Sequence, residues 1–179
     1  MLRWSALIVL GACSASVDGG GGADPDAPPR SNSTDASPDA LPCTGGDVSG
    51  TAPDGSCLQL FTGKQTFADA KLACETVGSH LAILNTQALD TFAEGLVKTN
   101  DTFIGLSDLA VEMQFRWVDD TALTFSAWNP TEPNDGDATY DEDCAIIAGA
   151  RVTKQWDDRP CAPTTMFPNA GSYAYLCQR

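Results

Sequence analysis

The cysteines constrain the fold of this 179-residue chain more than any other feature. There are seven of them, at positions 13, 43, 57, 74, 144, 161 and 177. The chain has no C-x-x-C pair and a single histidine, His80, so a zinc site built from these residues is disfavoured. In an exported chain we expect cysteines to pair in disulfides, because the environment is oxidising. An odd number leaves one cysteine that needs another explanation.

The amino terminus offers that explanation. Arg3 and the short, mostly apolar run 4–10 are typical of an export signal, and the run is too short to span a bilayer as a mature helix. The sequence at 10–13, LGAC, resembles the lipobox of bacterial lipoproteins, in which the cysteine becomes the lipidated first residue. The alternative is an ordinary secretory signal with a chance cysteine. If Cys13 carries lipid, six cysteines remain, and they allow fifteen pairings among which spacing cannot choose.

Residues 14–42 consist mainly of Gly, Ser, Pro, Asp and Ala. Such a stretch cannot bury enough apolar surface to offset its ordering entropy, so we expect a flexible tether. The sequence therefore predicts three parts: a lipoprotein signal peptide (1–12), a lipidated Cys13 with a disordered tether (13–42), and a folded domain (43–179). This organisation predicts an exported protein that is lipid-anchored to a bacterial envelope, at the outer membrane or cell surface.

The pattern in the folded part predicts an α+β domain. We expect helices at 66–78 and 85–98, each with apolar residues on one face; Thr66 caps the first, and Asn85 or Thr86 caps the second. Short strands are expected at 80–84, 102–106, 114–118, 144–149 and 172–178. Two helices followed by short strands indicate a small antiparallel sheet. The stretch 119–143 has turn residues and little periodicity, and long loops of this kind are usually functional.

An acidic run lies in that loop. The segment 132–144, EPNDGDATYDEDC, holds six acidic residues, among them Asp137 and Asp141, and no Lys or Arg occurs between Arg116 and Arg151. Such charges repel unless they are neutralised or point freely into water. Ca²⁺ takes six to eight oxygen ligands, and a divalent ion here would turn the repulsion into attraction. The net charge of −14 also makes a partnership with nucleic acid unfavourable.

Several motifs occur together in a familiar order. They are FADAKLAC, GSHLAIL, FIGLSD, FRWVDD, FSAWNPTEPND, EDC and QWDD. In this order, with six cysteines in register, the chain from Cys43 to Cys177 resembles the C-type lectin-like domain. The resemblance implies the long form of that fold: two helices, small antiparallel sheets, a long calcium-binding loop and three disulfides. The implied disulfides are Cys43–Cys57, Cys74–Cys177 and Cys144–Cys161.

The resemblance also implies two Ca²⁺ sites. The principal site maps onto Glu132, Asn134, Glu142, Asp157 and Asp158. The auxiliary site maps onto Asp108, Glu112, Asp135 and Asp143. In the family the proline of E-P-N, here Pro133, follows a cis peptide bond, which turns the residues on either side toward one ion.

In the family, two neighbouring sugar hydroxyls coordinate the principal calcium and hydrogen-bond to its ligands. The carbohydrate-binding residues implied here are Glu132, Asn134, Glu142 and Asp157. E-P-N resembles the version that selects the equatorial vicinal hydroxyls of mannose, glucose, N-acetylglucosamine and fucose. The expected partner is therefore a carbohydrate of this kind or a surface glycoprotein.

One departure affects this interpretation. The family usually has W-N-D, whereas this chain has Trp156-Asp157-Asp158. Asp157 can bind calcium but has no N–H₂ group to donate, so we expect one sugar hydroxyl to lose a hydrogen-bond partner at a cost of about 0.5–1.5 kcal/mol. Two alternatives therefore stay open: a calcium-stabilised protein-binding or adhesion module, and an envelope-structural lipoprotein without a specific ligand.

An enzyme is not expected. A catalytic triad needs a histidine, and His80 stands where the family often has a structural one. Two carboxylates could flank a glycosidic bond, but the same acids are better explained as cation ligands. Trp117, Trp128 and Trp156 are expected in the core rather than as sugar platforms.

Overall fold

The computed structural model describes residues 42–136, 140–165 and 168–179. The predicted signal peptide, Cys13, almost all of the tether and Asp137 lie outside these residues. Within them the elements follow the order β1 (Val48–Thr51), β2 (Cys57–Gln65), α1 (Phe67–Thr76), β3 (His80–Leu81), α2 (Gln87–Val97), β4 (Asp101–Ser107), β5 (Arg116–Trp117), β6 (Cys144–Ala148), β7 (Trp156–Arg159) and β8 (Tyr173–Gln178). No helix in the described part of the chain is long and apolar enough to cross a membrane.

Both predicted helices form, and their caps explain where they begin. The Thr66 hydroxyl accepts the Asp69 N–H at 3.2 Å, which caps the helix, and it donates to the Asp69 carboxylate at 2.8 Å. Thr86, rather than Asn85, caps α2 by accepting the N–H of Leu89. The first helix ends at Thr76, and Gly78 adopts a φ of +72°, which terminates the helical path.

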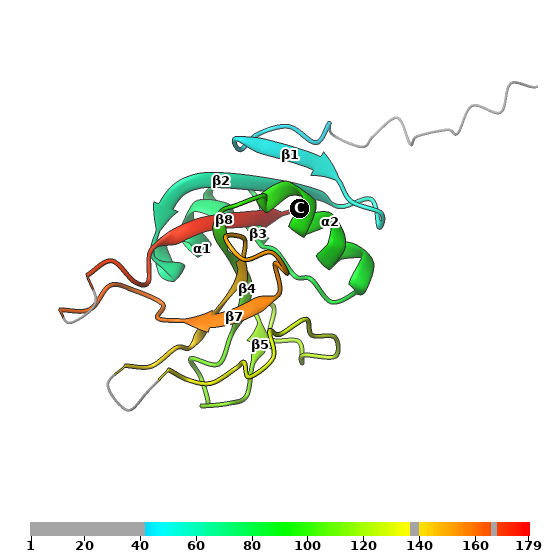
Figure 1. Ribbon diagram of the computed structural model, residues 1–179. Coiled ribbons are helices and arrows are strands. Elements are labelled where there is room, and N and C mark those ends of the chain that lie inside the picture. The colour runs from blue at the N-terminus through cyan, green and yellow to red at the C-terminus, as the bar shows by residue number, and fades with distance from the viewer. Residues whose placement is uncertain (1–41, 137–139, 166–167) are drawn as a thin grey trace, which may run out of the picture. The chain divides into compact units, whose positions relative to one another are not determined.

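The strands form one sheet in the order β1-β2-β8-β4-β6-β7, with β3 added beside β8 and β5 beside β4 (Figure 1). The prediction of purely antiparallel sheets is wrong at one pair, because β4 and β8 run parallel with Thr102 opposite Ala174. These strands are far apart in the sequence, and the intervening chain crosses over to bring them together. Local patterning carries no information about such a direction.

The prediction also missed three strands and overextended two. β1, β2 and β7 were not expected, whereas β3 covers only 80–81 of the predicted 80–84 and β5 only 116–117 of 114–118. Beyond β3 the backbone still finds partners: Ala82 N–H donates to the Leu176 carbonyl, and Ile83 N–H donates to the Gln178 side chain at 2.8 Å. The segment is therefore extended and hydrogen-bonded without belonging to a ladder.

Two hydrophobic clusters lie on the sheet. The larger includes the fully buried Trp156 and the almost fully buried Trp117, and Trp128 packs against it half-buried, so the predicted core role of the tryptophans is confirmed. The smaller surrounds Phe103 and Phe67. The predicted disulfides Cys43–Cys57, Cys74–Cys177 and Cys144–Cys161 are all present. The second closes a separation of 103 residues, for which chain entropy predicts about 4–5 kcal/mol of stabilisation.

Candidate metal centre

Strands β6 and β7 place the acidic residues of the two halves of the site side by side. They pair antiparallel, with Cys144 opposite Arg159 and Ala145 opposite Asp158. Glu142 lies two residues before β6, and Asp157 lies within the adjacent strand β7, so the pairing of these strands brings the two groups near each other. The Cys144–Cys161 disulfide joins the same two segments just beyond this pairing. Asp157 and Asp158 thus project from a cross-linked part of the sheet, and Glu142 lies just before it.

The E-P-N turn is fixed onto β7 by backbone hydrogen bonds. Asn129 N–H donates to the Trp156 carbonyl at 2.8 Å, which holds the incoming segment beside the strand. The Glu132–Pro133 peptide bond is cis, as the resemblance implied. After it, the N–H groups of Asn134 and Asp135 donate to one carboxylate oxygen of Asp158, at 2.9 and 2.7 Å. The turn is therefore closed over a buried aspartate.

The residues of the predicted principal site converge. Glu132, Asp157 and Asp158 each offer a carboxylate oxygen within 4.8 Å of the others, which suits ligands on one ion with Ca–O distances of about 2.3–2.6 Å. The Asn134 amide donates to the carboxylate of Glu132. Glu142 is joined to the group through Arg159, which lies 3.4 Å from it. The structure therefore brings three of the predicted ligands together, with Asn134 bonded to one of them and Glu142 linked to the group through Arg159.

The electrostatics of this group are those of a site that lacks positive charge. The pKa of Glu142 is raised to about 7, chiefly by burial and also by the charges of Asp158 and Asp157, against the opposing effect of Arg159. The pKa of Glu132 is raised by burial and then by the same two aspartates. Among the described residues, one oxygen of Asp157 and one of Asp158 are buried without a hydrogen-bond partner. Buried charged oxygens without a partner are costly, and a cation is the group that would satisfy them.

Two arginines supply part of that charge. Arg151 and Arg159 each place a guanidinium nitrogen 2.7 Å from the same oxygen, Oδ2, of Asp157. The principal site thus holds two guanidinium groups and four carboxylates, those of Glu132, Glu142, Asp157 and Asp158. The remaining two negative charges would be balanced by one dication. Sequence reasoning missed both arginines, although W-D-D-R placed one of them beside the predicted ligands.

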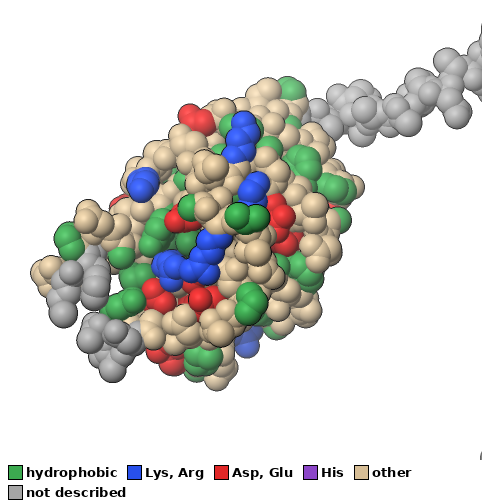
Figure 2. Space-filling model, in the orientation of Figure 1, with side chains coloured by type: hydrophobic (Ala, Val, Ile, Leu, Met, Phe, Trp, Pro, Cys, Tyr) green, Lys and Arg blue, Asp and Glu red, His purple; other side chains and the backbone are tan. Residues whose placement is uncertain are grey.

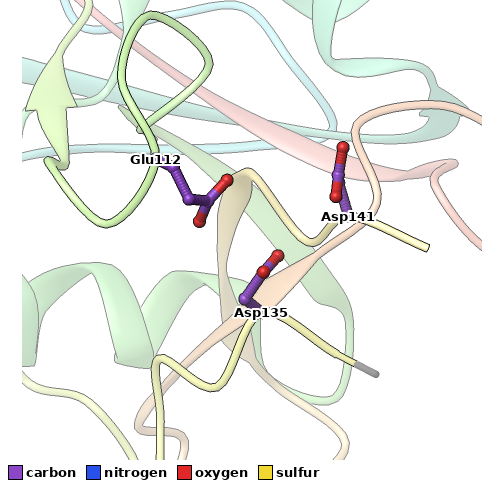
Figure 3. A group of neighbouring side chains, drawn as sticks. All are labelled: Glu112, Asp135 and Asp141. Carbon is purple, nitrogen blue, oxygen red and sulfur yellow. The ribbon is translucent and has the colours of Figure 1, made fainter. Parts of the chain in front are cut away.

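The auxiliary site forms a second acidic cluster. The carboxylates of Glu112, Asp135 and Asp141 point toward one another, with ligand atoms within 4.8 Å; Glu112 comes from the segment between β4 and β5, and the two aspartates come from the long loop between β5 and β6 (Figure 3). Asp141, which is not among the ligands that the resemblance implied, is exposed and belongs to this cluster. The other two predicted members, Asp108 and Asp143, lie close by.

Asp108 and Asp143 support the cluster from its base. The Asp108 N–H donates to the Asp143 carbonyl at 3.1 Å, and one Asp108 oxygen accepts the Met113 N–H at 2.8 Å. The other Asp108 oxygen is buried without a partner among the described residues. Burial raises the pKa of Asp108 to about 6, with smaller contributions from Glu112 and Asp143. The donor set of both clusters is all oxygen, which fits a hard dication such as Ca²⁺.

A disulfide-bonded α+β domain with two all-oxygen clusters on its long loop has the features of a lectin C-type domain. Residues 63–167 match the family model for that domain. The chain belongs to the C-type lectin domain family, whose members typically bind carbohydrates.

Named relatives agree with this assignment. Lectin BRA-3 of Megabalanus rosa is 34% identical over 116 residues, which cover 64% of this chain and 70% of that protein. Several other curated relatives are matched over half of their length or less. These relatives all come from eukaryotes, so they do not bear on the predicted bacterial envelope.

Solved structures share the fold. The human scavenger receptor C-type lectin carbohydrate-recognition domain has a TM-score of 0.62 at 26% identity, covering 76% of this chain and 98% of that one. The cow CD23 domain, solved in the presence of a GlcNAc2Man3 oligosaccharide, has a TM-score of 0.57 at 26% identity, with 69% and 87% coverage. A calcium-independent type II antifreeze protein gives 0.57 at 26%, with 69% and 85% coverage.

Proposed function

We propose that this chain is a calcium-dependent carbohydrate-binding module. The observation that carries the proposal is the pair of buried carboxylate oxygens of Asp157 and Asp158 that have no partner among the described residues and lie in the cluster with Glu132. A cation bound there would be held by Glu132, Asn134, Glu142, Asp157 and Asp158. When bound, Ca²⁺ supplies coordination positions for two neighbouring sugar hydroxyls.

The chain's own residues orient the sugar. The carboxylates of Glu132 and Glu142 accept hydroxyl protons, and the Asn134 amide can donate to a hydroxyl oxygen. The E-P-N sequence supports mannose-type ligands with equatorial vicinal hydroxyls, that is mannose, glucose, N-acetylglucosamine and fucose. The printed titles of two structural relatives name carbohydrate-recognition domains, which supports the same class of ligand. The acidic residues then act as ligands, and no catalytic role is proposed for them.

The amino terminus supports a proposal about where the module acts. We infer that Cys13 is lipidated and that residues 14–42 tether the domain to a bacterial envelope. Many tethered copies would gain avidity for a multivalent glycan from weak single sites. Mass spectrometry of the amino-terminal peptide tests the lipid directly: a Cys13→Ser chain should lose the acyl mass and leave the membrane fraction, and an unmodified Cys13 in the native protein refutes the anchor.

A second function is favoured by one observation. Asp157 lacks the amide donor of the family's asparagine, so the domain could use calcium only to stiffen the loop that binds a protein partner. The likeness to an antifreeze protein described as calcium-independent is consistent with uses of this fold other than calcium-dependent sugar binding.

A glycan array with calcium, and again with a chelator, tests the first proposal. Wild type should bind mannose-type glycans only with calcium, and Glu132→Gln should lose that binding. Asp120→Asn is a matched control, because Asp120 is exposed and its left-handed φ of +65° tolerates asparagine. Binding that is insensitive to the chelator contradicts the proposal. Calcium binding without any glycan signal supports the protein-binding function instead.

A further inference from the structure

Two guanidinium groups stand at the edge of the proposed sugar site. Arg151 and Arg159 both contact Oδ2 of Asp157, which is fully buried, while their own side chains are 46% and 27% exposed. Arg159 also donates to the Asp158 carbonyl at 3.0 Å. Each guanidinium has five N–H donors, so donors are available beyond these contacts. On the face in Figure 2, Lys and Arg side chains gather over β7, directly beside Asp and Glu side chains.

Arg159 supplies what Asp157 lacks. An asparagine at 157 would carry an N–H₂ group where the aspartate has its second oxygen, and that oxygen accepts from Arg159 at 2.7 Å. The hydrogen-bond donor next to Asp157 is therefore the Arg159 guanidinium, which lies one hydrogen bond beyond the position that an asparagine N–H₂ group would occupy. A guanidinium differs from an amide in being cationic and in matching carboxylate, sulfate and phosphate groups with paired donors.

Charge balance allows an anion at this position. With a dication bound, the four carboxylates and two guanidinium groups of the principal site are neutral in total. Without the two arginines the same loaded site would carry two negative charges and would repel an acidic ligand. The arginines are thus the residues that make an anionic ligand acceptable on a chain whose net charge is −14.

Arg151 also lines a hollow to which Asp157 does not contribute. It has a volume of about 370 Å³, and three of its lining residues are basic: Lys98, Arg151 and Lys154. The Lys154 ammonium donates to the Glu94 carbonyl at 2.9 Å, which holds it in place. Arg151 therefore connects the proposed hydroxyl-binding group with a basic hollow large enough for part of a second sugar.

We propose that Arg159 and Arg151 form an anion subsite next to the vicinal-hydroxyl site, and that the preferred ligands are saccharides carrying a carboxylate, sulfate or phosphate group. This inference rests on the proposed function, because the hydroxyls of the same ligand would bind at the principal site. It adds a class of ligand, acidic saccharides, that E-P-N alone does not indicate.

A pair of monosaccharides that differ only at C6, where one carries a hydroxymethyl group and the other a carboxylate, tests the subsite. Methyl α-glucoside and methyl α-glucuronide share the equatorial 3- and 4-hydroxyls, and only the second carries a carboxylate. Calorimetric titration of the calcium-loaded protein should give about tenfold tighter binding of the glucuronide, because charge-assisted hydrogen bonds are the stronger ones. Raising the salt from about 10 mM to about 500 mM should reduce that preference, since exposed charges are screened. Sulfated and phosphorylated sugars on an array then rank the three anions.

Variants assign the preference to the arginines. Arg159→Gln should abolish it and Arg151→Gln should weaken it, while Arg116→Gln, at an exposed arginine that donates to the Asp120 carbonyl, should leave it unchanged. Titration with calcium alone checks that each variant still loads. Equal binding of both sugars by wild type, or a preference that survives Arg159→Gln, overturns the subsite while calcium-dependent sugar binding stands. Absence of calcium-dependent binding to every sugar overturns the proposed function and the subsite with it.

Discussion

Arg159→Gln should lower the stability of the metal-free protein and raise its affinity for calcium. Without metal, the substitution removes one of the two arginine partners of the buried Asp157, at 2.7 Å, and an ion pair with the buried Glu142, at 3.4 Å. Removing one partner of a fully buried ion pair costs about 3–5 kcal/mol. Because the Arg159 side chain is 27% exposed, water can replace part of the interaction, and we expect a loss of about 1–3 kcal/mol in the free energy of unfolding.

The same substitution should strengthen calcium binding. It removes a positive charge from the edge of a site that would hold a dication, so the calcium affinity should rise by about fivefold or more, equivalent to about 1 kcal/mol. Urea unfolding with chelator and with saturating calcium measures both effects on one protein. The gap in stability between variant and wild type should narrow when calcium is added.

A double substitution identifies the cause. In the Asp157→Asn background the main buried partner of Arg159 is already neutral, so adding Arg159→Gln should cost about 1 kcal/mol less than it does in wild type. Arg116→Gln is the matched control and should change stability by no more than about 0.5 kcal/mol. A loss for Arg159→Gln as small as the control's, or equal losses in both backgrounds, would show that the ion pairs do not stabilise the metal-free site.

Three further predictions concern the metal. Calcium at about 100 times its Kd should stabilise the native state by about 2.7 kcal/mol in calorimetry at neutral pH, and Asp158→Asn should remove most of this gain; identical melting with calcium and chelator contradicts the metal centre. The metal-free protein should lose stability between about pH 4.5 and pH 7. The pKa of Glu142 is about 7 in the native state, so the native state binds this proton more tightly than the unfolded chain does. The stability that comes from this tighter binding is lost as the pH rises to 7. Calcium should reverse this slope, since its ligands must be deprotonated, and a metal-free protein that gains stability over that range refutes the argument. Asp141→Asn should weaken calcium binding at the auxiliary cluster severalfold in titrations, whereas Asp120→Asn should not; equal isotherms would exclude Asp141 as a ligand.

The sequence was sufficient to predict those features that depend on neighbouring residues and motifs. Both helices could be placed because Thr66 and Thr86 cap them and their apolar residues recur on one face. The motif order indicated the family, the disulfides and the ligand residues that now converge on the principal site. These features depend on residue type and spacing, which a sequence displays directly.

What the sequence did not indicate is non-local. β7 has two aspartates in four residues, a composition that local strand propensity disfavours, and it forms because it pairs with the buried strand β6. The parallel contact between β4 and β8 depends on a crossover of the chain. Asp141 joins Glu112 from a distant loop, and Arg151 reaches Asp157 across a turn. Each of these contacts depends on the tertiary structure, and the periodicity of the sequence does not predict it.

The buried carboxylates of the site oppose folding, and a bound cation would offset that cost. Asp157 and Asp158 are buried directly after Trp156 in β7. The indole N–H of Trp156 donates to a third buried carboxylate, that of Asp90, at 2.7 Å. So many buried carboxylates oppose folding, and burial accordingly raises the pKa of Asp90 to about 6 and that of Asp157 above its usual range. The arginines offset only half of the charge at the principal site. A domain arranged in this way can stay folded without metal through its disulfides and ion pairs, yet it retains unsatisfied oxygens whose free energy a bound dication would recover.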